Sequence, residues 1–259
     1  MKPTGIKIPS LALACAIILA WSLPGRAALQ GDSLDTAKGP LVIHPLVHAT
    51  FVMAWNGELI YFDPVGGKSR FGDIPPADAV FITHDHPDHL DVPTLQSVTN
   101  PETTIVAPKA VFDKLPETLQ KQTHVMANGD TWELDGFKVE AVAMYNLPPN
   151  NHHPKGRGNG YVLTLGGRRV YVSGDTDGTP EMRALKNIDM AFVCMNPPYT
   201  MSVEQAADAV LAFKPRIVYP YHYRSPGGLN DIQKFKRLVS VDKNIQVRLR
   251  NWYPNQPSR

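Results

Sequence analysis

The chain of 259 residues is long enough to bury a hydrophobic core, and its 26 Lys and Arg against 24 Asp and Glu give a net charge of +2. This near balance excludes a strongly basic surface of the kind that binds nucleic acid. Two cysteines are too few for a disulfide framework.

The first 27 residues have the pattern of a secretory signal peptide. Lys2 and Lys7 precede an apolar run at 11–21, and the small residues Ala27 and Ala28 follow it. The alternative is an uncleaved membrane anchor, but the run is shorter than the roughly 20 apolar residues that a spanning helix needs. We therefore expect cleavage without a stable membrane anchor, a mature domain at 28–259, and a periplasmic or secreted protein.

Removal of this leader changes the charge and the cysteine count of the chain. The leader contains three of the 26 basic residues and no acidic residue, so the mature chain has 23 basic and 24 acidic side chains. We therefore expect no nucleic-acid partner. Cys194 is then the sole cysteine, which excludes an internal disulfide, and the apolar residues before it predict that it is buried.

Three tight-turn dipeptides between short apolar runs predict β-hairpins, because primed turns need residues that accept positive φ. They are Asn56-Gly57, Asp135-Gly136 and Gly166-Gly167. The segments 55–62 and 165–172 also share a pattern at an offset of 110, a turn followed by an apolar-Tyr-apolar strand. That repeat hints at two similar halves.

Helices are predicted between the strands. Asp91 with Pro93 predicts one helix start, and Ser202 with Gln205 forms a capping-box pattern before an apolar helical face. A third helix is expected within 230–240. No linker or low-complexity tract interrupts the mature chain, so we expect one α/β domain.

Candidate metal ligands directly follow three predicted strands. The strand at 78–83 is followed by "HDHPDH", the strand at 168–174 by Asp175, and the strand at 216–221 by His222. Strand ends are where a sheet gathers residues that are distant in sequence into one site on a rigid support.

The spacing within "HDHPDH" predicts metal binding. His84 and His86 are two residues apart, so in an extended chain both rings face one side. Pro87 turns the chain, and Asp88 and His89 can then bind at a second position nearby. Imidazole and carboxylate together suit zinc, iron or manganese, whereas calcium prefers oxygen alone. The alternative, a solvated loop that binds nothing, is disfavoured by three His and one Asp in six positions.

The H-x-H-x-D-H motif, the later G-D-T and the late His resemble the metallo-β-lactamase-fold hydrolases. The resemblance extends from "HATFVMAWNGELIYFDP" to "VYPYHY". Within that superfamily the chain is most similar to the branch of L-ascorbate-6-phosphate lactonase and N-acyl-phosphatidylethanolamine phospholipase D. The resemblance implies an α/β fold, a four-layer αββα sandwich with the site along one edge of two facing sheets.

The resemblance also implies two metal ions and the roles of their ligands. A hydroxide bridging the metals would be the nucleophile. The second metal, together with Asp88, would steady the charge that develops on the attacked centre, and Asp63 would orient a ligand histidine. The implied ligands are His84 and His86 with a third His for the first metal, Asp88, His89 and His222 for the second, and Asp175 as the bridge.

The third ligand of the first metal remains open in the sequence. The family supplies a histidine after a strand like the one at 137–145, where this chain has Asn146. We predict His153, with His152 as the second choice and an open site at Asn146 as the third. A loop whose two histidines are merely exposed is a further alternative.

Two further features are left with alternatives. His48 matches an early histidine of the branch and is a candidate catalytic residue lining the pocket, or else a strand histidine with a satisfied hydrogen bond. Lys155 and Arg157 could contact an anionic substrate, or else belong to a charged surface loop.

Together these features predict an exported dinuclear hydrolase that cleaves an ester, lactone or phosphodiester bond of a small molecule. Zinc is expected, with manganese or iron as alternatives. No cysteine of the mature chain occupies a ligand position, so lactam hydrolysis is disfavoured. The alternatives are a redox-active iron protein on the same scaffold and a catalytically silent metal-binding protein. The sequence does not indicate an oligomeric state.

Overall fold

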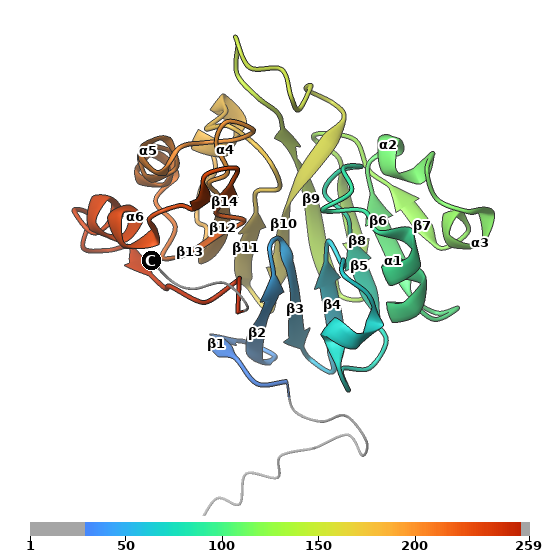
Figure 1. Ribbon diagram of the computed structural model, residues 1–259. Helices are drawn as coiled ribbons and strands as arrows, with labels where there is room; N and C mark the ends of the chain where they lie inside the picture. The colour runs from blue at the N-terminus through green and yellow to red at the C-terminus, as the bar shows by residue number, and fades with distance from the viewer. Residues whose placement is uncertain (1–28, 255–259) are drawn as a thin grey trace, which may run out of the picture.

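The computed structural model describes residues 29–254, so the predicted signal peptide lies outside the described residues. Two seven-stranded sheets face each other, and helices cover the outer face of each (Figure 1). The predicted four-layer αββα sandwich is therefore confirmed.

The first sheet contains the N-terminal half of the fold. Its strands follow chain order, antiparallel from β1 to β4 and parallel from β4 to β7. The strands are β1 Asp32–Thr36, β2 Gly39–Val47, β3 Thr50–Trp55, β4 Glu58–Phe62, β5 Ala79–Phe81, β6 Thr104–Ala107 and β7 Thr123–Val125. The helices between them are the 3₁₀ helix η1 Lys68–Phe71, then α1 Val92–Val98, α2 Lys109–Phe112 and α3 Glu117–Gln120.

The second sheet repeats this plan. It is antiparallel from β8 to β11 and parallel from β11 through β12 and β13 to β16. Its strands are β8 Thr131–Leu134, β9 Phe137–Met144, β10 Gly158–Leu165, β11 Arg168–Val172, β12 Met190–Cys194, β13 Ile217–Tyr221 and β16 Gln246–Val247. The remaining elements are α4 Pro180–Arg183, α5 Val203–Phe213, α6 Ile232–Val239 and the small pair β14 Arg224–Ser225 and β15 Gly228–Leu229. The repeat at 55–62 and 165–172 corresponds to the β3–β4 and β10–β11 turns, so the two similar halves are confirmed.

The predicted turns and caps are present. Asn56 and Gly57 both have positive φ, 52° and 87°, and join β3 to β4. Ser202 and Gln205 form the complete capping box of α5, and the Asp91 side chain accepts a hydrogen bond from Thr94 N at the start of α1. Local sequence thus specifies these element boundaries.

The core lies between the sheets and is rich in aromatic rings. Phe51 stacks on Phe62 at 4.7 Å and on Phe192 of the opposite sheet at 4.4 Å between ring centroids. Cys194 is fully buried, as predicted. Burying each such ring stabilises the fold by about 1.5–3 kcal/mol, which holds the sheet edges in a fixed relation.

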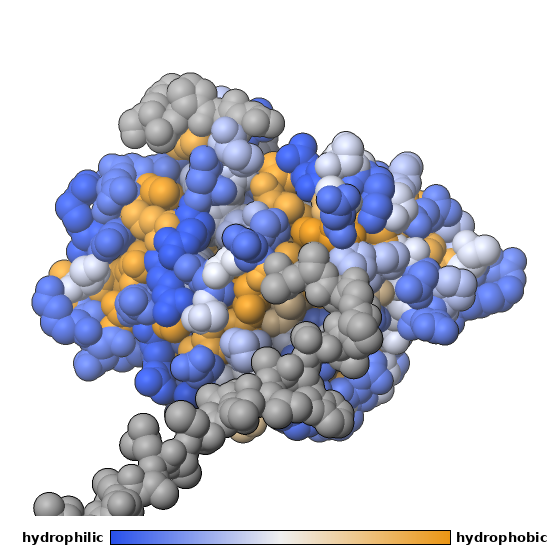
Figure 2. All heavy atoms as spheres, turned by 90° about the horizontal axis from the view of Figure 1, so that it is seen from below, coloured by the Kyte–Doolittle hydropathy of each residue, from blue (hydrophilic) through white to orange (hydrophobic). Residues whose placement is uncertain are grey.

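The outer surface is mainly polar. Hydrophilic residues cover much of the face seen from below, with apolar residues between them (Figure 2). Within 29–254, no helix has the length and hydrophobicity that crossing a membrane requires.

Candidate metal centre

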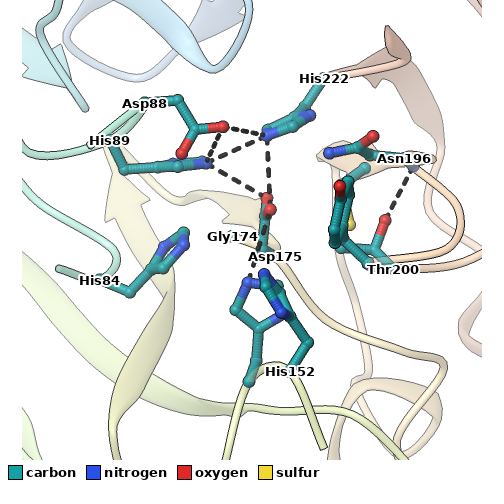
Figure 3. Close-up of polar contacts among 12 residues, drawn as sticks. His84, Asp88, His89, His152, Gly174, Asp175, Asn196, Thr200 and His222 are labelled. Atoms are coloured by element: carbon teal, nitrogen blue, oxygen red, sulfur yellow. Dashed lines mark hydrogen bonds and ion pairs between the residues drawn. The ribbon is translucent and has the colours of Figure 1, made fainter. Parts of the chain in front are cut away.

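The loops that follow six strands meet at one edge of the sandwich. The strands β2, β4, β5, β9, β11 and β13 end just before them. Figure 3 shows side chains from four of these loops converging on Asp175 and His222. The residues brought together are His48, Asp63, His84, His86, Asp88, His89, His153, Asp175 and His222.

The first ligand group consists of His84, His86 and His153. One nitrogen of each ring lies within 4.8 Å of the others. The Nε2 atoms of His84 and His153 are buried and have no hydrogen-bond partner among the described residues. The Nδ1 of His84 lies 3.0 Å from Thr83 Oγ1, and that of His153 lies 3.1 Å from Asn146 Oδ1. These contacts at Nδ1 leave Nε2 of both rings available to an ion.

The second group lies beside the first and consists of Asp88, His89 and His222, with His48. The Nε2 atoms of His89 and His222 lie only 3.1 Å apart, and Asp88 Oδ2 lies 3.6 Å from His222 Nε2. All four residues place a ligand atom within 4.8 Å of the others. Such crowding of nitrogen and oxygen lone pairs is typical of a site that holds a cation.

Asp175 lies between the two groups. Its Oδ2 is 3.8 Å from His153 Nε2 and 3.3 Å from His222 Nε2, while its Oδ1 is 3.5 Å from His89 Nε2. Asp175 Oδ1 is buried without a conventional hydrogen-bond partner in the described part of the chain. The carboxylate therefore faces both groups, which is the placement that a bridging ligand requires.

Asp63, which directly follows β4, contacts a residue of the second group and the residue that precedes His84 of the first group. It is buried, and its Oδ2 lies 2.8 Å from His89 Nδ1. The same carboxylate accepts hydrogen bonds from the Thr83 backbone N and hydroxyl, each at 2.7 Å. Asp63 thus contacts His89, a predicted ligand, and this contact directs His89 Nε2 toward Asp175.

Most histidines of the site are neutral near pH 7. Burial lowers the pKa of His84 well below its usual value, and burial lowers the pKa of His48 and of His153 to about 4. Burial also lowers the pKa of His86. A neutral imidazole can donate a lone pair to a metal without first losing a proton.

The carboxylates of the site remain ionised. Burial disfavours the Asp175 carboxylate, but nearby His222 and His89 outweigh burial and hold its pKa well below the usual value. Burial likewise disfavours a charged His89, yet Asp175 and Asp63 hold the pKa of His89 well above the usual value. The buried, ionised Asp175 carboxylate thus requires compensating positive charge, and the nitrogen and oxygen donors around it fit divalent metal ions.

Three residues of the site have a strained, left-handed backbone conformation. His48, Asp63 and His222 have positive φ values of 59°, 40° and 46°. This left-handed conformation costs a residue with a side chain of order 1 kcal/mol, and it is retained where surrounding contacts impose it. Each of the three follows a strand directly, so the turn changes the direction of the chain where its side chain enters the site.

The loop between β9 and β10 brings both histidines close to His86, with ring centroids 4.9 Å away for His153 and 5.0 Å away for His152, but of the two it is His153 whose nitrogen belongs to the first group. His153 is 3 % exposed, whereas His152 is exposed and its ring lies 4.8 Å from the Tyr199 ring. The Asn146 amide accepts hydrogen bonds from the His153 backbone and ring and donates to Tyr199 O at 2.9 Å. Asn146 therefore supports His153, and this geometry favours the first of the three sequence alternatives.

We expect His153→Ala to bind about one metal ion fewer per chain than the unsubstituted protein, and His152→Ala to bind the same number. The reason is that only His153 directs a buried, unpartnered nitrogen at His84 and His86. Elemental analysis of both variants after dialysis measures the stoichiometry. Loss of metal confined to His152→Ala would reverse this assignment, and no loss in either would remove the loop from the metal site.

A buried carboxylate with two half-exposed cationic partners, which sequence reasoning missed, holds the ligand loops together. Asp85, between His84 and His86, is buried, and it accepts hydrogen bonds from Arg157 at 3.1 and 2.7 Å. Lys114 Nζ lies 2.6 Å from the same carboxylate. A bidentate Arg–carboxylate pair fixes geometry as well as charge, so this pair ties the His84–His86 segment to the loop that carries His153.

His48 lies behind Asp88 and contacts it. Its Nε2 lies 2.9 Å from Asp88 Oδ2, and its Nδ1 lies 2.8 Å from the hydroxyl of Tyr253. Its backbone oxygen accepts a hydrogen bond from His222 N at 3.1 Å. His48 is not among the residues that line the adjacent cavity, so its catalytic role stays a prediction.

A cavity of about 400 Å³ opens beside the two ligand groups. This is a size typical of small-molecule sites. Sequence reasoning missed Asn196 and Tyr199 as site residues, because they follow β12 in a segment without a recognisable motif. The cavity is lined by His86, Pro87, Asp88, His152, Asp175, Asn196 and Tyr199.

Comparison with known proteins places the chain in a family. A model of the beta-lactamase superfamily domain matches residues 59–223. A UPF0173 metal-dependent hydrolase of Thermococcus onnurineus is 32% identical over 177 residues, which cover 66% of this chain and 78% of that protein.

Solved structures of similar proteins have the same fold. A protein of Parabacteroides distasonis, provisionally named a metal-dependent hydrolase, is 41% identical with a TM-score of 0.77, covering 86% of this chain and 99% of its own. A metallo hydrolase of Ignicoccus hospitalis is 22% identical with a TM-score of 0.69, covering 82% and 95%, and shows the shared fold. The similarity to the lactonase and phospholipase branch stays a prediction. The chain belongs to the beta-lactamase superfamily and is a metal-dependent hydrolase.

Proposed function

We propose that the protein is a dinuclear hydrolase that cleaves an ester, lactone or phosphodiester bond of a small molecule. The observation that carries this proposal is the position of Asp175, a buried carboxylate that faces both ligand groups through separate contacts. Zinc suits the nitrogen-rich donor set best, and manganese or iron is compatible with it.

Each ligand group would bind one metal ion. His84, His86 and His153 would hold the first ion, Asp88, His89 and His222 would hold the second, and Asp175 would contact both. Two divalent ions held there would supply an activated water molecule at neutral pH and polarise the bond to be cleaved.

The side chains around the ions orient the reactants. Asp88 is half-exposed beside the cavity, and its carboxylate is placed to accept a hydrogen bond from the attacking water. Hydrogen bonds from His222 and His48 outweigh burial and hold the pKa of Asp88 below its usual value, so it stays an acceptor. His48 acts as a positioning residue that fixes Asp88, with its other nitrogen fixed by Tyr253.

Hydrolysis of a panel of substrates tests this function. We expect zinc-loaded protein to hydrolyse at least one of an aryl ester, a five-membered lactone and bis(4-nitrophenyl) phosphate, and His89→Ala to lose that activity. Rates are measured at equal protein and added-zinc concentrations, with Lys243→Ala on the exposed surface as the control. A correctly folded protein with two zinc ions that hydrolyses none of the three would support the catalytically silent alternative instead.

Export is part of the proposal and is supported by the leader-like pattern at 1–27. Mass spectrometry of the intact protein from its native compartment tests it. Loss of the first 27 residues is expected, and a full-length mass would contradict export by this route.

A further inference from the structure

Two aromatic side chains, His152 and Tyr199, form one wall of the cavity beside the ligand groups. His152 comes from the β9–β10 loop and Tyr199 from the segment after β12, and both line the cavity. Tyr199 is 37% exposed and His152 is also exposed. A molecule in the cavity can therefore reach both rings of this aromatic wall.

The aromatic wall adjoins the first ligand group. Between ring centroids, His152 lies 5.0 Å from His86 and 4.7 Å from His153. The ring of Tyr199 lies 4.8 Å from that of His152. A substrate whose reacting bond lies at the metal centre therefore places its neighbouring group against this wall.

Asparagine side chains fix the two aromatic residues relative to each other. Asn150 Oδ1 accepts a hydrogen bond from His152 N at 3.1 Å, and Asn150 Nδ2 donates to Pro198 O at 3.1 Å, next to Tyr199. Asn146 Nδ2 donates to Tyr199 O at 2.9 Å. The backbone of both aromatic residues is thus held in place before a substrate binds, which reduces the ordering cost of binding.

The geometry of the two rings suits a planar group. They are tilted by 43° instead of being stacked face to face, so part of each ring stays free. Aromatic groups form offset-stacked or edge-to-face contacts that contribute beyond the apolar area they bury. A planar aromatic ring in the cavity gains this contribution, whereas a saturated ring of similar size gains only the buried area.

The cavity offers no cationic side chain to an anionic group. Within the described chain, no Lys or Arg lines it. Arg157 is paired with Asp85, and Lys155 is paired with Glu181, so the surface-loop alternative describes both cations better than substrate binding does. Anionic groups are normally recognised by Arg, Lys or the N-terminus of a helix. Away from the metal ions, the lining therefore suits an uncharged group.

We propose that the substrate carries a planar, uncharged aromatic group, and that this group packs against Tyr199 and His152 while the bond to be cleaved lies at the metal centre. This substrate class rests on the proposed hydrolase function. Tyr199 is then a specificity-determining residue, and its ring supplies the contact, not its hydroxyl.

Binding of carboxylates tests the inference without requiring turnover. Phenylacetate, cyclohexylacetate and trimethylammonioacetate share a carboxylate that can bind the metal ions, and they differ in the group that reaches the aromatic wall. By isothermal titration calorimetry, we expect zinc-loaded protein to bind phenylacetate about two- to tenfold more tightly than cyclohexylacetate, the range of one aromatic contact. Tighter binding of trimethylammonioacetate that depends on Tyr199 would indicate a site for a cation and would overturn the inference.

Substitutions of Tyr199 separate the role of its ring from that of its hydroxyl and its size. Tyr199→Phe should keep the preference for phenylacetate, and Tyr199→Leu should lose it while keeping its metal content. His152→Leu should weaken the preference too, which keeps the test decisive if Tyr199→Leu does not fold. Leu147→Ala is the matched control, because Leu147 is equally exposed in the β9–β10 loop but is not among the residues that line the cavity. A preference that survives in both leucine variants would contradict the inference.

Hydrolysis of the matching esters separates this inference from the proposed chemistry. We expect a lower KM for methyl phenylacetate than for methyl cyclohexylacetate, with similar kcat after correction for their rates with hydroxide, because the aromatic contact acts on binding. Equal KM values together with equal binding of the two carboxylates would overturn the inference and leave the hydrolase intact. Tyr199-dependent preference for phenylacetate without turnover of any substrate would retain the inference and refute the hydrolase.

Discussion

Asp175→Asn is expected to lose one of two bound metal ions and nearly all hydrolysis. The substitution keeps the shape of the side chain but removes the negative charge that faces both ligand groups, at 3.3 Å from His222 Nε2 and 3.8 Å from His153 Nε2. A neutral amide cannot hold two divalent ions close together against their mutual repulsion. We expect kcat to fall by about three orders of magnitude, in the range that loss of a group stabilising the transition state produces.

The measurement combines elemental analysis with kcat on the best substrate of the panel. Asp208→Asn is the matched control, because Asp208 is exposed on α5 and pairs only with Arg183 at the surface. Near-ultraviolet circular dichroism establishes that both variants are folded. Two metal ions and a normal rate in Asp175→Asn would show that this carboxylate does not bridge them.

Chelation is expected to abolish hydrolysis and to lower the melting temperature of the same sample by about 10 °C. An ion that binds only the folded state at a thousand times its Kd stabilises that state by about 4 kcal/mol. In a domain of this size, each kcal/mol shifts the melting temperature by about 2–4 °C. Part of this binding energy would come from compensating the buried carboxylate of Asp175, which faces both ligand groups.

Differential scanning calorimetry with and without a chelator measures the shift, and added zinc should restore both stability and activity. Calcium should restore neither, because the ligand groups are mainly imidazole. The Asp175→Asn variant serves as the internal control and should respond less to the chelator. Full activity after complete removal of metal would refute the mechanism proposed for this site.

Local sequence predicted the elements and the ligand types well. The hairpin at Asn56-Gly57 and the α5 capping box formed as expected, because each depends on φ preferences and hydrogen bonds within a few residues. The H-x-H-x-D-H motif was also sufficient to predict a metal site, because its spacing and the preceding strand β5 place its candidate ligands at one sheet edge.

Contacts between distant segments could not be predicted in this way. Asp85 and Arg157 are 72 positions apart, and His48 and Tyr253 are 205 apart. No periodicity or turn signal links such residues. Asn196 was missed for the same reason, because its place in the cavity wall comes from the fold and not from its neighbours in sequence.

The sequence by itself determined which histidines and aspartates directly follow which strands. These residue types also determined that the predicted site is a metal site. Only the tertiary structure favours His153 over His152 as the predicted ligand, because two adjacent histidines have the same local propensities. Packing of the β9–β10 loop buried one ring against Asn146 and left the other exposed beside Tyr199. Burial removes water from His153 and keeps its ring neutral near pH 7, which makes its nitrogen available to a metal, and burial is a property of the whole fold.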